Sequence, residues 1–299
     1  MIWIVTGATG LIGRALVPTL LKRDYQVLAI SRSATNFYAD LDHPKLEARN
    51  FDLIDNYSIR LGKKSEEAGL IMLASHITTS SNMRMLEGIL ALDTFGHLRL
   101  VESLRPVLRH MIYASSCTAY GRPSYFPVDE SAQLAPVNVY ALSKVASERT
   151  LSLISQNWNI SLAILRISQI YGPGAPQIGA MYNFLRAAHL GERPRITCSP
   201  DNFRDYCHVS DVVQAIETVV LRQSTGVYNI GSGDKTTIEQ LARSCLKAAD
   251  RYYEPEFDYQ NPVANMWLDI SRAQNELNYD PKIELELGVK MENQRLYAN

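Results

Sequence analysis

Short segments of strand length alternate with helical patterns along the first half of the chain. Five such segments, most of them apolar, cover residues 2–6, 27–30, 46–52, 69–74 and 107–115. Between them, apolar residues recur every three or four positions, as over 85–104, which is typical of an amphipathic helix. A continuous apolar strand such as 69–74 is typical of a parallel sheet that is covered on both faces. The pattern therefore predicts an α/β fold around a parallel sheet that is covered on both faces.

Three glycines follow the first apolar segment at once, and their spacing predicts a strand, a tight turn and the start of a helix. Gly7 can adopt a backbone angle that a Cβ atom forbids, Gly10 lets the main chain approach a pyrophosphate, and Gly13 lets the helix pack on its strand. The helix N-terminus then presents N–H groups and a partial positive charge to phosphates. The alternative is an ordinary glycine-rich turn. We predict a dinucleotide site at Gly7, Thr9, Gly10, Leu11, Ile12 and Gly13.

Length, charge and cysteine content narrow the choice of partners. The chain of 299 residues has room for a dinucleotide-binding domain and a smaller second domain. Its net charge of −1 disfavours a nucleic-acid or membrane surface as the main partner. The spacing of the four cysteines suits neither zinc nor a disulfide framework, so we predict no metal. The chain opens directly on a strand and has no apolar run of membrane-spanning length, so we expect a cytoplasmic protein.

The end of the second apolar segment bears on which dinucleotide binds. In this architecture it faces the adenosine ribose, where a carboxylate favours NAD and an arginine can pair with the 2′-phosphate of NADP. Ser31, Arg32 and Ser33 stand there, without an acid. We therefore expect NADP(H) to be favoured over NAD(H), with Ser31 and Arg32 as contacts. The alternative is that Arg32 is a solvated arginine just past the strand.

Two further strand ends supply candidates at the same edge of the sheet, where ligands bind in this architecture. Asp52 and Leu53 follow the third strand, and the Asp52 carboxylate either reaches the adenine amino group or closes a turn. His76, just past the fourth strand, is a candidate substrate contact. The residues before it are candidate cofactor contacts, namely Leu73, Ala74 and Ser75.

The fifth strand and the next helix carry a pattern for acid–base chemistry. Tyr140 and Lys144 are four residues apart and so share one face of a helix that starts near residue 139. A free tyrosine has a pKa of about 10, but a nearby cation, from lysine or an oxidised nicotinamide, favours the phenolate and lowers that pKa. The hydroxyls of Ser116 and Thr118, beside Cys117, lie just past a strand end. We predict hydride transfer coupled to general acid–base catalysis.

In this order, the motifs resemble those of extended short-chain dehydrogenase/reductases of the NAD-dependent epimerase/dehydratase type. The resemblance extends over nearly the whole chain, through residues 113–121, 165–174, 204–212, 226–233 and 268–273. It implies a Rossmann domain with a doubly wound, mostly parallel sheet, formed by residues 1–170 with 205–230 returning to it. It also implies a smaller α/β substrate-binding domain formed mainly by 171–299. It also implies a homodimer joined through the helices near 85–104 and 140–155.

The resemblance also implies roles for single residues. Ser116, Tyr140 and Lys144 correspond to the catalytic residues, and Tyr140 and Lys144 would contact the cofactor as well. Arg204 resembles an arginine that reaches the substrate diphosphate. The substrate contacts that we expect are His76, Ser116, Cys117, Thr118, Tyr140, Gln169 and Arg204.

Several positions depart from the family pattern. Asp93 and Gln169 stand where the family commonly has asparagine. A second phosphate-binding arginine has no counterpart in residues 261–267, which weakens the assignment to nucleotide sugars. Cys117 and Thr118 stand where family dehydratases usually carry Asp-Glu, so we do not expect 4,6-dehydration.

We therefore expect an NAD(P)-dependent enzyme that transfers a hydride on a nucleotide-activated sugar, at C4. An epimerase oxidises and re-reduces the sugar with one bound cofactor, whereas a 4-keto reductase consumes a reduced cofactor at each turnover. The motifs fit both. The alternatives are a reductase of a non-sugar carbonyl and a catalytically silent protein that senses dinucleotides. The silent protein should have lost Ser116, Tyr140 or Lys144, and all three are present.

Overall fold

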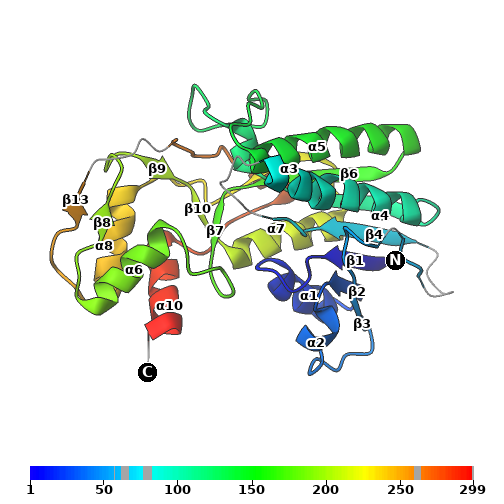
Figure 1. The fold of residues 1–299 in the computed structure, drawn as a ribbon, viewed down its shortest axis with the longest axis horizontal. Coiled ribbons are helices and arrows are strands. Elements are labelled where there is room, and N and C mark those ends of the chain that lie inside the picture. The colour runs from blue at the N-terminus through cyan, green and yellow to red at the C-terminus, as the bar shows by residue number, and fades with distance from the viewer. Residues whose placement is uncertain (57, 62–66, 77–82, 259–263, 298–299) are drawn as a thin grey trace.

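A seven-stranded parallel sheet forms the centre of the larger part of the molecule, on the right of Figure 1. The computed structural model describes residues 1–299 except 57, 62–66, 77–82, 259–263 and 298–299. The sheet comprises β1 (Ile2–Thr6), β2 (Gln26–Ser31), β3 (Leu46–Asn50), β4 (Ala68–Met72), β5 (Leu108–Ser116), β6 (Ser161–Ile167) and β11 (Gly226–Ile230). Their order is β11-β6-β5-β4-β1-β2-β3. The predicted doubly wound sheet is confirmed, and its order reverses between β1 and β4, the point where ligands bind in such sheets.

Helices cover both faces of this sheet (Figure 1). One face carries α1 (Gly13–Lys22) and α7 (Val209–Arg222), with the short α2 (Ala34–Phe37) and α9 (Ser271–Leu277) near its ends. The other carries α3 (Met83–Leu90), α4 (His97–Leu104) and α5 (Val139–Trp158). Because successive strand residues point to opposite faces, Trp3 packs in the first layer and Ile4 in the second.

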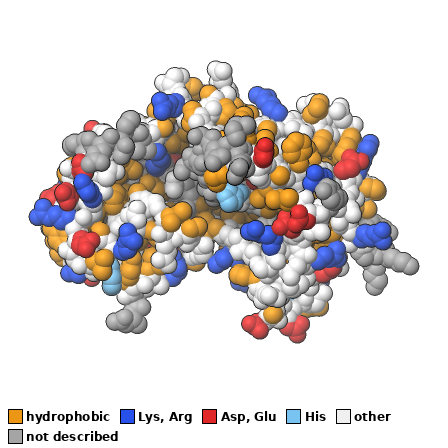
Figure 2. Space-filling view, viewed as in Figure 1, with side chains coloured by type: hydrophobic (Ala, Val, Ile, Leu, Met, Phe, Trp, Pro, Cys, Tyr) orange, Lys and Arg blue, Asp and Glu red, His pale blue; other side chains and the backbone are white. Residues whose placement is uncertain are grey.

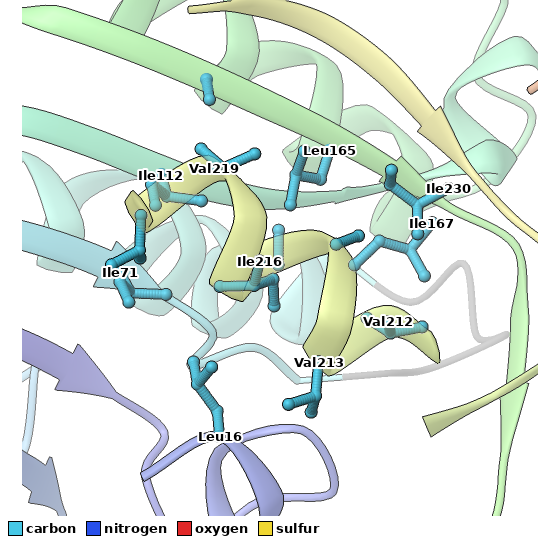
Figure 3. Close-up of a cluster of buried hydrophobic side chains, with 14 of the residues drawn as sticks. Leu16, Ile71, Ile112, Leu165, Ile167, Val212, Val213, Ile216, Val219 and Ile230 are labelled. Carbon is cyan, nitrogen blue, oxygen red and sulfur yellow. The ribbon is translucent and has the colours of Figure 1, made fainter. Parts of the chain in front are cut away.

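The core beneath α7 fixes the sheet against its first helical layer. Figure 3 shows Val212, Val213, Ile216 and Val219 of α7 against side chains of the strands and Leu16 of α1. Each fully buried side chain of this size contributes about 1.5–3 kcal/mol to folding. The strand side chains drawn there are Ile71, Ile112, Leu165, Ile167 and Ile230. This packing holds the carboxyl ends of the strands in place.

The helix predicted over residues 85–104 is not one regular α-helix. A π-helical segment, η1 (Ala91–Gly96), joins α3 to α4. Apolar residues at helical spacing identify the helix, but they do not reveal the wider turn within it. A Cβ on Gly96 would lie 2.8 Å from the Leu53 carbonyl oxygen, so this segment passes very close to the loop after β3. Such π segments are frequent at functional sites.

A smaller α/β unit lies at the other end of the molecule, on the left of Figure 1. It contains α6 (Ala180–Leu190), α8 (Ile238–Ala248) and α10 (Leu285–Tyr297) around a core of its own that includes Phe184, Leu241 and Val289. Three two-stranded sheets accompany the helices: β7 (Gln169–Tyr171) with β10 (Tyr206–His208), β8 (Arg195–Ile196) with β13 (Glu256–Phe257), and β9 (Phe203–Arg204) with β12 (Thr236–Thr237).

The chain enters this unit after β7 and returns from β10 into α7 and β11 of the main sheet. The expected smaller α/β unit is therefore present, and its division from the sheet at residue 170 stays a prediction. Among the helices of the described ranges, none combines the length and apolar character needed to cross a membrane.

Candidate functional site

The glycine turn lies between β1 and α1, at the point where the strand order reverses. Gly7 has a φ of 61°, and a Cβ there would lie 2.7 Å from the backbone nitrogen of Ala74. A Cβ on Gly13 would lie 2.4 Å from the Gly7 carbonyl oxygen. Both positions therefore require glycine, and together they form a cradle of bare main chain at the start of a helix. This cradle suits the pyrophosphate of a dinucleotide.

A cavity of about 450 Å³ opens beside this turn. Its lining includes most of the predicted cofactor contacts, namely Gly7, Thr9, Gly10, Ser31, Arg32, Asp52, Leu53, Leu73, Ala74 and Ser75. Leu11, Ile12 and Gly13 lie at the start of α1, outside this lining. His76, predicted as a substrate contact, lies in the cofactor cavity. In Figure 2 the surface is also indented between the sheet on the right and the smaller unit on the left.

The sequence did not single out the apolar wall of this cavity. Phe51 and Ile54 flank the predicted Asp52–Leu53 pair, and α3 with η1 supplies a further set, Met85, Gly88, Ile89 and Leu92. The positions 85, 88, 89 and 92 are those of one helical face, so their periodicity was the available signal. The sequence analysis predicted the helix without showing that one of its faces borders a cavity.

Polar contacts of the predicted ribose and adenine residues are mostly local. The Asp52 carboxylate accepts a hydrogen bond from the Ile54 backbone N–H at 2.9 Å, as in the turn that was the alternative for this residue. The Ser31 hydroxyl accepts bonds from the Thr9 hydroxyl at 3.2 Å and the Ser33 N–H at 3.3 Å. Arg32 is exposed.

A buried hydroxyl joins the ends of β1 and β4. The Thr6 Oγ1 atom accepts the backbone N–H groups of Leu73 at 3.0 Å and Ala74 at 3.1 Å. It has one proton to donate, and His97 Nε2 lies 3.1 Å away. The other ring nitrogen, Nδ1, donates to the Asp93 carbonyl at 3.0 Å. Burial lowers the pKa of His97 to about 4, so the ring is neutral near pH 7 and can accept the Thr6 proton.

The predicted catalytic residues meet at the ends of β5 and α5. The Asn138 side chain caps α5 by accepting the Ala141 N–H at 2.8 Å, which fixes the first turns of the helix. The Lys144 Nζ atom lies 5.5 Å from the centre of the Tyr140 ring and donates to the Ala114 carbonyl at 3.1 Å. Ser116 is the last residue of β5. One side chain from the sheet and two from the helix therefore share this corner.

Burial dominates the titration of Tyr140. It raises the pKa of Tyr140 above the usual value, although Lys144 and a hydrogen bond from Ser116 lower it. Lys144 thus lowers the pKa of Tyr140, as expected, but burial raises that pKa by more. For Lys144, burial favours the neutral amine, but Tyr113, Asp93 and Tyr140 oppose this effect and leave its pKa raised. Lys144 is therefore a permanent cation at neutral pH.

The predicted substrate residues gather on the side that faces the smaller unit. Cys117 and Thr118 form the start of η2 (Cys117–Tyr120), and the Thr118 hydroxyl donates to Ser116 Oγ at 3.0 Å. Burial raises the pKa of the Cys117 thiol to about 12, although Arg204 lowers it. Arg204 of β9 is therefore near enough to Cys117 for its charge to act on the thiol.

Gln169, another expected substrate contact, lies on the strand that pairs with β10. Gln169 has an exposed side chain, and its backbone N–H donates to the Asp205 carbonyl at 3.1 Å, next to Arg204. Of residues 261–267, where no second arginine is found, 261–263 lie outside the described residues.

The glycine cradle and the serine, tyrosine and lysine beside it define a dinucleotide-dependent enzyme of the short-chain dehydrogenase/reductase class. The model of the NAD dependent epimerase/dehydratase family matches residues 3–231, and the chain belongs to this family. The resemblance found in the sequence is thereby confirmed.

Three relatives illustrate the likeness. UDP-glucose 4-epimerase from Mycolicibacterium smegmatis is 26% identical over 298 residues, which cover 96% of this chain and 95% of that protein. A mutant UDP-glucuronic acid 4-epimerase from Bacillus cereus, solved with UDP-4-deoxy-4-fluoro-glucuronic acid and NAD, has a TM-score of 0.86 at 22% identity and covers 99% of this chain and 100% of its own. UDP-glucose 4-epimerase from Thermus thermophilus, solved with NAD, has a TM-score of 0.82 at 22% identity, with 100% of both chains covered.

The expected preference for NADP(H) is wrong. Both solved relatives named above contain NAD. The expectation rested on Arg32, whose exposed side chain fits the alternative of a solvated arginine just past the strand. An exposed guanidinium is well hydrated and needs no phosphate partner, so its presence at a strand end does not select a 2′-phosphate.

Proposed function

We propose that the protein is an NAD-dependent 4-epimerase of a nucleotide-activated sugar. The observation that carries this proposal is the convergence of Ser116, Tyr140 and Lys144 at the sheet edge that also holds the glycine cradle. The names of the related proteins support a nucleotide-sugar epimerase. NAD fits the cavity because the cradle at Gly7 and Gly13 leaves main chain bare where a pyrophosphate needs close approach.

The residues of this chain divide the chemistry between them. Tyr140 takes the proton from the sugar O4 as the sugar is oxidised and returns it on reduction, as a general base and then a general acid. Ser116 hydrogen-bonds the same oxygen and orients it. Lys144 favours the phenolate form of Tyr140 by its charge and binds the nicotinamide ribose. When bound, NAD would accept the C4 hydride and deliver it to the opposite face of the keto sugar.

Substrate binding is assigned to the side of the site that faces the smaller unit. Arg204 binds the diphosphate, because a partly buried guanidinium forms strong charge-assisted hydrogen bonds with phosphate oxygens. Cys117, Thr118 and Gln169 line the sugar side. The cofactor contacts are those predicted from the sequence, with His76 at their margin.

The protein acts as a homodimer in this proposal. Large apolar side chains are exposed on the helices assigned to the dimer interface: Phe95 is 53% exposed, Leu142 44% and Leu153 58%. Pairing the η1 and α5 faces of two copies would remove them from water. Sedimentation of the wild type against Leu153→Glu tests this, since a charge at the interface should yield monomers.

The function is tested on the purified protein before anything is added. The protein is denatured, and any released dinucleotide is identified by mass. Close to one NAD per chain supports an internally recycled cofactor and hence an epimerase. UDP-glucose and UDP-glucuronic acid are then incubated with the protein, without added cofactor, and the products are separated. Conversion to the 4-epimer in either case supports the proposal. An enzyme that turns over only with added reduced cofactor contradicts it.

A further inference from the structure

A buried carboxylate faces the catalytic lysine, and the mechanism above gives it no role. Asp93 of η1 is 0% exposed and Lys144 is 3% exposed. Their Oδ2 and Nζ atoms are 3.6 Å apart. Burying a carboxylate is costly unless charge and hydrogen bonds compensate, so its presence at this position requires an explanation. In the family pattern this position is commonly an uncharged asparagine.

The Asp93 carboxylate connects the cofactor side to the catalytic helix. From the end of β4, Ser75 Oγ donates to Oδ2 at 2.8 Å and the His76 N–H points to Oδ1 at 3.4 Å. From α5, Ser143 Oγ lies 3.1 Å from Oδ2. The carboxylate therefore has partners on both elements that must be held together for hydride and proton transfer.

The π-helical segment holds this carboxylate in place through its backbone. The Asp93 carbonyl accepts a hydrogen bond from His97 Nδ1 at 3.0 Å, and Ser147 Oγ of α5 lies at the same distance. His97 in turn contacts Thr6, which orders the turn after β4. Asp93 is thus anchored at its main chain and its side chain, and its position relative to Lys144 is defined.

The charge of the Asp93 side chain affects how strongly Lys144 acts on Tyr140. The Lys144 ammonium lies near both Asp93 and Tyr140, so the Asp93 carboxylate competes with the Tyr140 phenolate for one cation. Three buried neighbours are neutral near pH 7: burial lowers the pKa of His97 to about 4 and raises the pKa of Tyr113 and of Cys117 to about 12. His76 borders Asp93 through its backbone N–H, and the Arg204 guanidinium acts on Cys117. Asp93 itself raises the pKa of Tyr140.

We propose that Asp93 is a positioning residue that holds Lys144 against the end of β5 and moderates the pull of the ammonium on the Tyr140 hydroxyl. The inference rests on the roles proposed above for Tyr140 and Lys144. An asparagine would preserve the shape of the site and leave the ammonium with Tyr140 as its anionic partner. Asp93 would thereby shift the pH range in which the enzyme works toward higher pH.

The test is Asp93→Asn. The asparagine fills the same volume, and the Ser143 hydroxyl can accept from its amide while donating to the Tyr140 carbonyl, 2.8 Å away. Tyrosinate absorbance is followed against pH, with bound dinucleotide left in place, in this variant and in the same variant carrying Tyr140→Phe. The difference isolates Tyr140. We expect its midpoint to fall by about one pH unit relative to the wild-type pair, since a neighbouring charge shifts a pKa by about 1–3 units.

The pH dependence of kcat is the second measurement. The acid-side midpoint should move down with the tyrosinate midpoint, by about one unit. Asp211→Asn is the matched control. Asp211 is also buried and accepts the backbone N–H groups of Lys282 and Ile283. It lies in α7, which covers the opposite face of the sheet from α5. This variant should leave the Tyr140 titration where it is in the wild type.

An unchanged Tyr140 midpoint in folded Asp93→Asn overturns the proposal. Should that variant fail to fold, Asp93→Ser gives the same test, because any uncharged residue should move the midpoint in the same direction. The absorbance titration uses no sugar, so its result is distinct from a failure of the proposed epimerase activity.

Discussion

The two sides of the site are built in different ways. The phosphate-binding part of the cofactor side consists of main chain at strand ends, and its geometry follows from one turn: Gly7 at a φ of 61° and Gly13 against the Gly7 carbonyl. The substrate side consists of side chains from β5, η2 and α5 and from short strands beside the smaller unit, with Arg204 on a strand of two residues. A backbone site is encoded by a few local residues, whereas a side-chain site depends on how distant segments pack. The function of the cofactor side can therefore be predicted from the sequence more directly than that of the substrate side.

The largest expected effect is on catalysis by Tyr140, which lies where the cofactor side and the substrate side meet. Tyr140→Phe removes the group that moves the proton, and loss of a general acid–base typically costs about 100- to 10,000-fold in rate. We expect kcat to fall in that range, measured by separation of the two epimers, while NAD content by mass stays as in the wild type. Activity that persists at the wild-type level would show that Tyr140 is not the proton donor.

A second effect concerns the stability of the cofactor side. Unfolded histidine takes up a proton as the pH falls below about 6.5, whereas buried His97 does so only near 4. The unfolded state is thus favoured as the pH falls through this window, and the loss sums to about 3 kcal/mol, since one pKa unit is worth about 1.4 kcal/mol. Urea unfolding between pH 7 and 4.5 should show this slope in the wild type and a weaker one in His97→Gln. His43→Gln, on the loop before β3, should keep the wild-type slope.

A third effect tests the substrate side alone. Arg204→Met removes a charge-assisted contact to the diphosphate, which is worth about 1.5–3 kcal/mol. KM for the nucleotide sugar should rise by about 10- to 100-fold, with NAD content unchanged. Arg222→Met, on the exposed end of α7, is the matched control and should leave KM as it is. A normal KM in Arg204→Met would place the diphosphate elsewhere.

The smallest expected effect tests whether the main chain of the glycine turn binds NAD. Gly7→Ala puts a residue with a Cβ at a left-handed φ, which costs about 1–2 kcal/mol, and against the Ala74 nitrogen. NAD affinity, measured by calorimetry on stripped protein, should fall by about tenfold. Gly191→Ala has a similar φ of 76° but open space around its Cβ. It should cost about the same 1–2 kcal/mol of folding stability and leave NAD affinity intact. Equal losses of NAD affinity in both variants would mean that the cradle is not specific.

Local patterns predicted the sheet and the glycine turn because both follow from neighbours in sequence. The five predicted strands end within two residues of the observed ones. Tyr140 and Lys144 were found by the same logic, since residues four apart on a helix share a face. These features need no knowledge of distant contacts.

Contacts across the fold could not be predicted. Thr6 and His97 are 91 residues apart in the chain, and nothing in either segment indicates the hydrogen bond between them. The π turn that sets the place of Asp93 leaves the helical periodicity almost intact. The prediction that NADP(H) is preferred over NAD(H) was wrong for a related reason. A strand-end arginine shows which group is available, but its solvation is a property of the folded surface.

The return of α7 and β11 to the sheet has a consequence for how the chain is made. The apolar face that Figure 3 shows under α7, and the hydrogen-bonding edge of β6, stay uncovered until residues 209–230, which follow only the first part of the smaller unit, leave the ribosome. Exposed strand edges and apolar faces are prone to misassembly during synthesis. A nascent chain that stops near residue 170 should therefore engage chaperones, and the sheet becomes self-sufficient only once β11 has been translated.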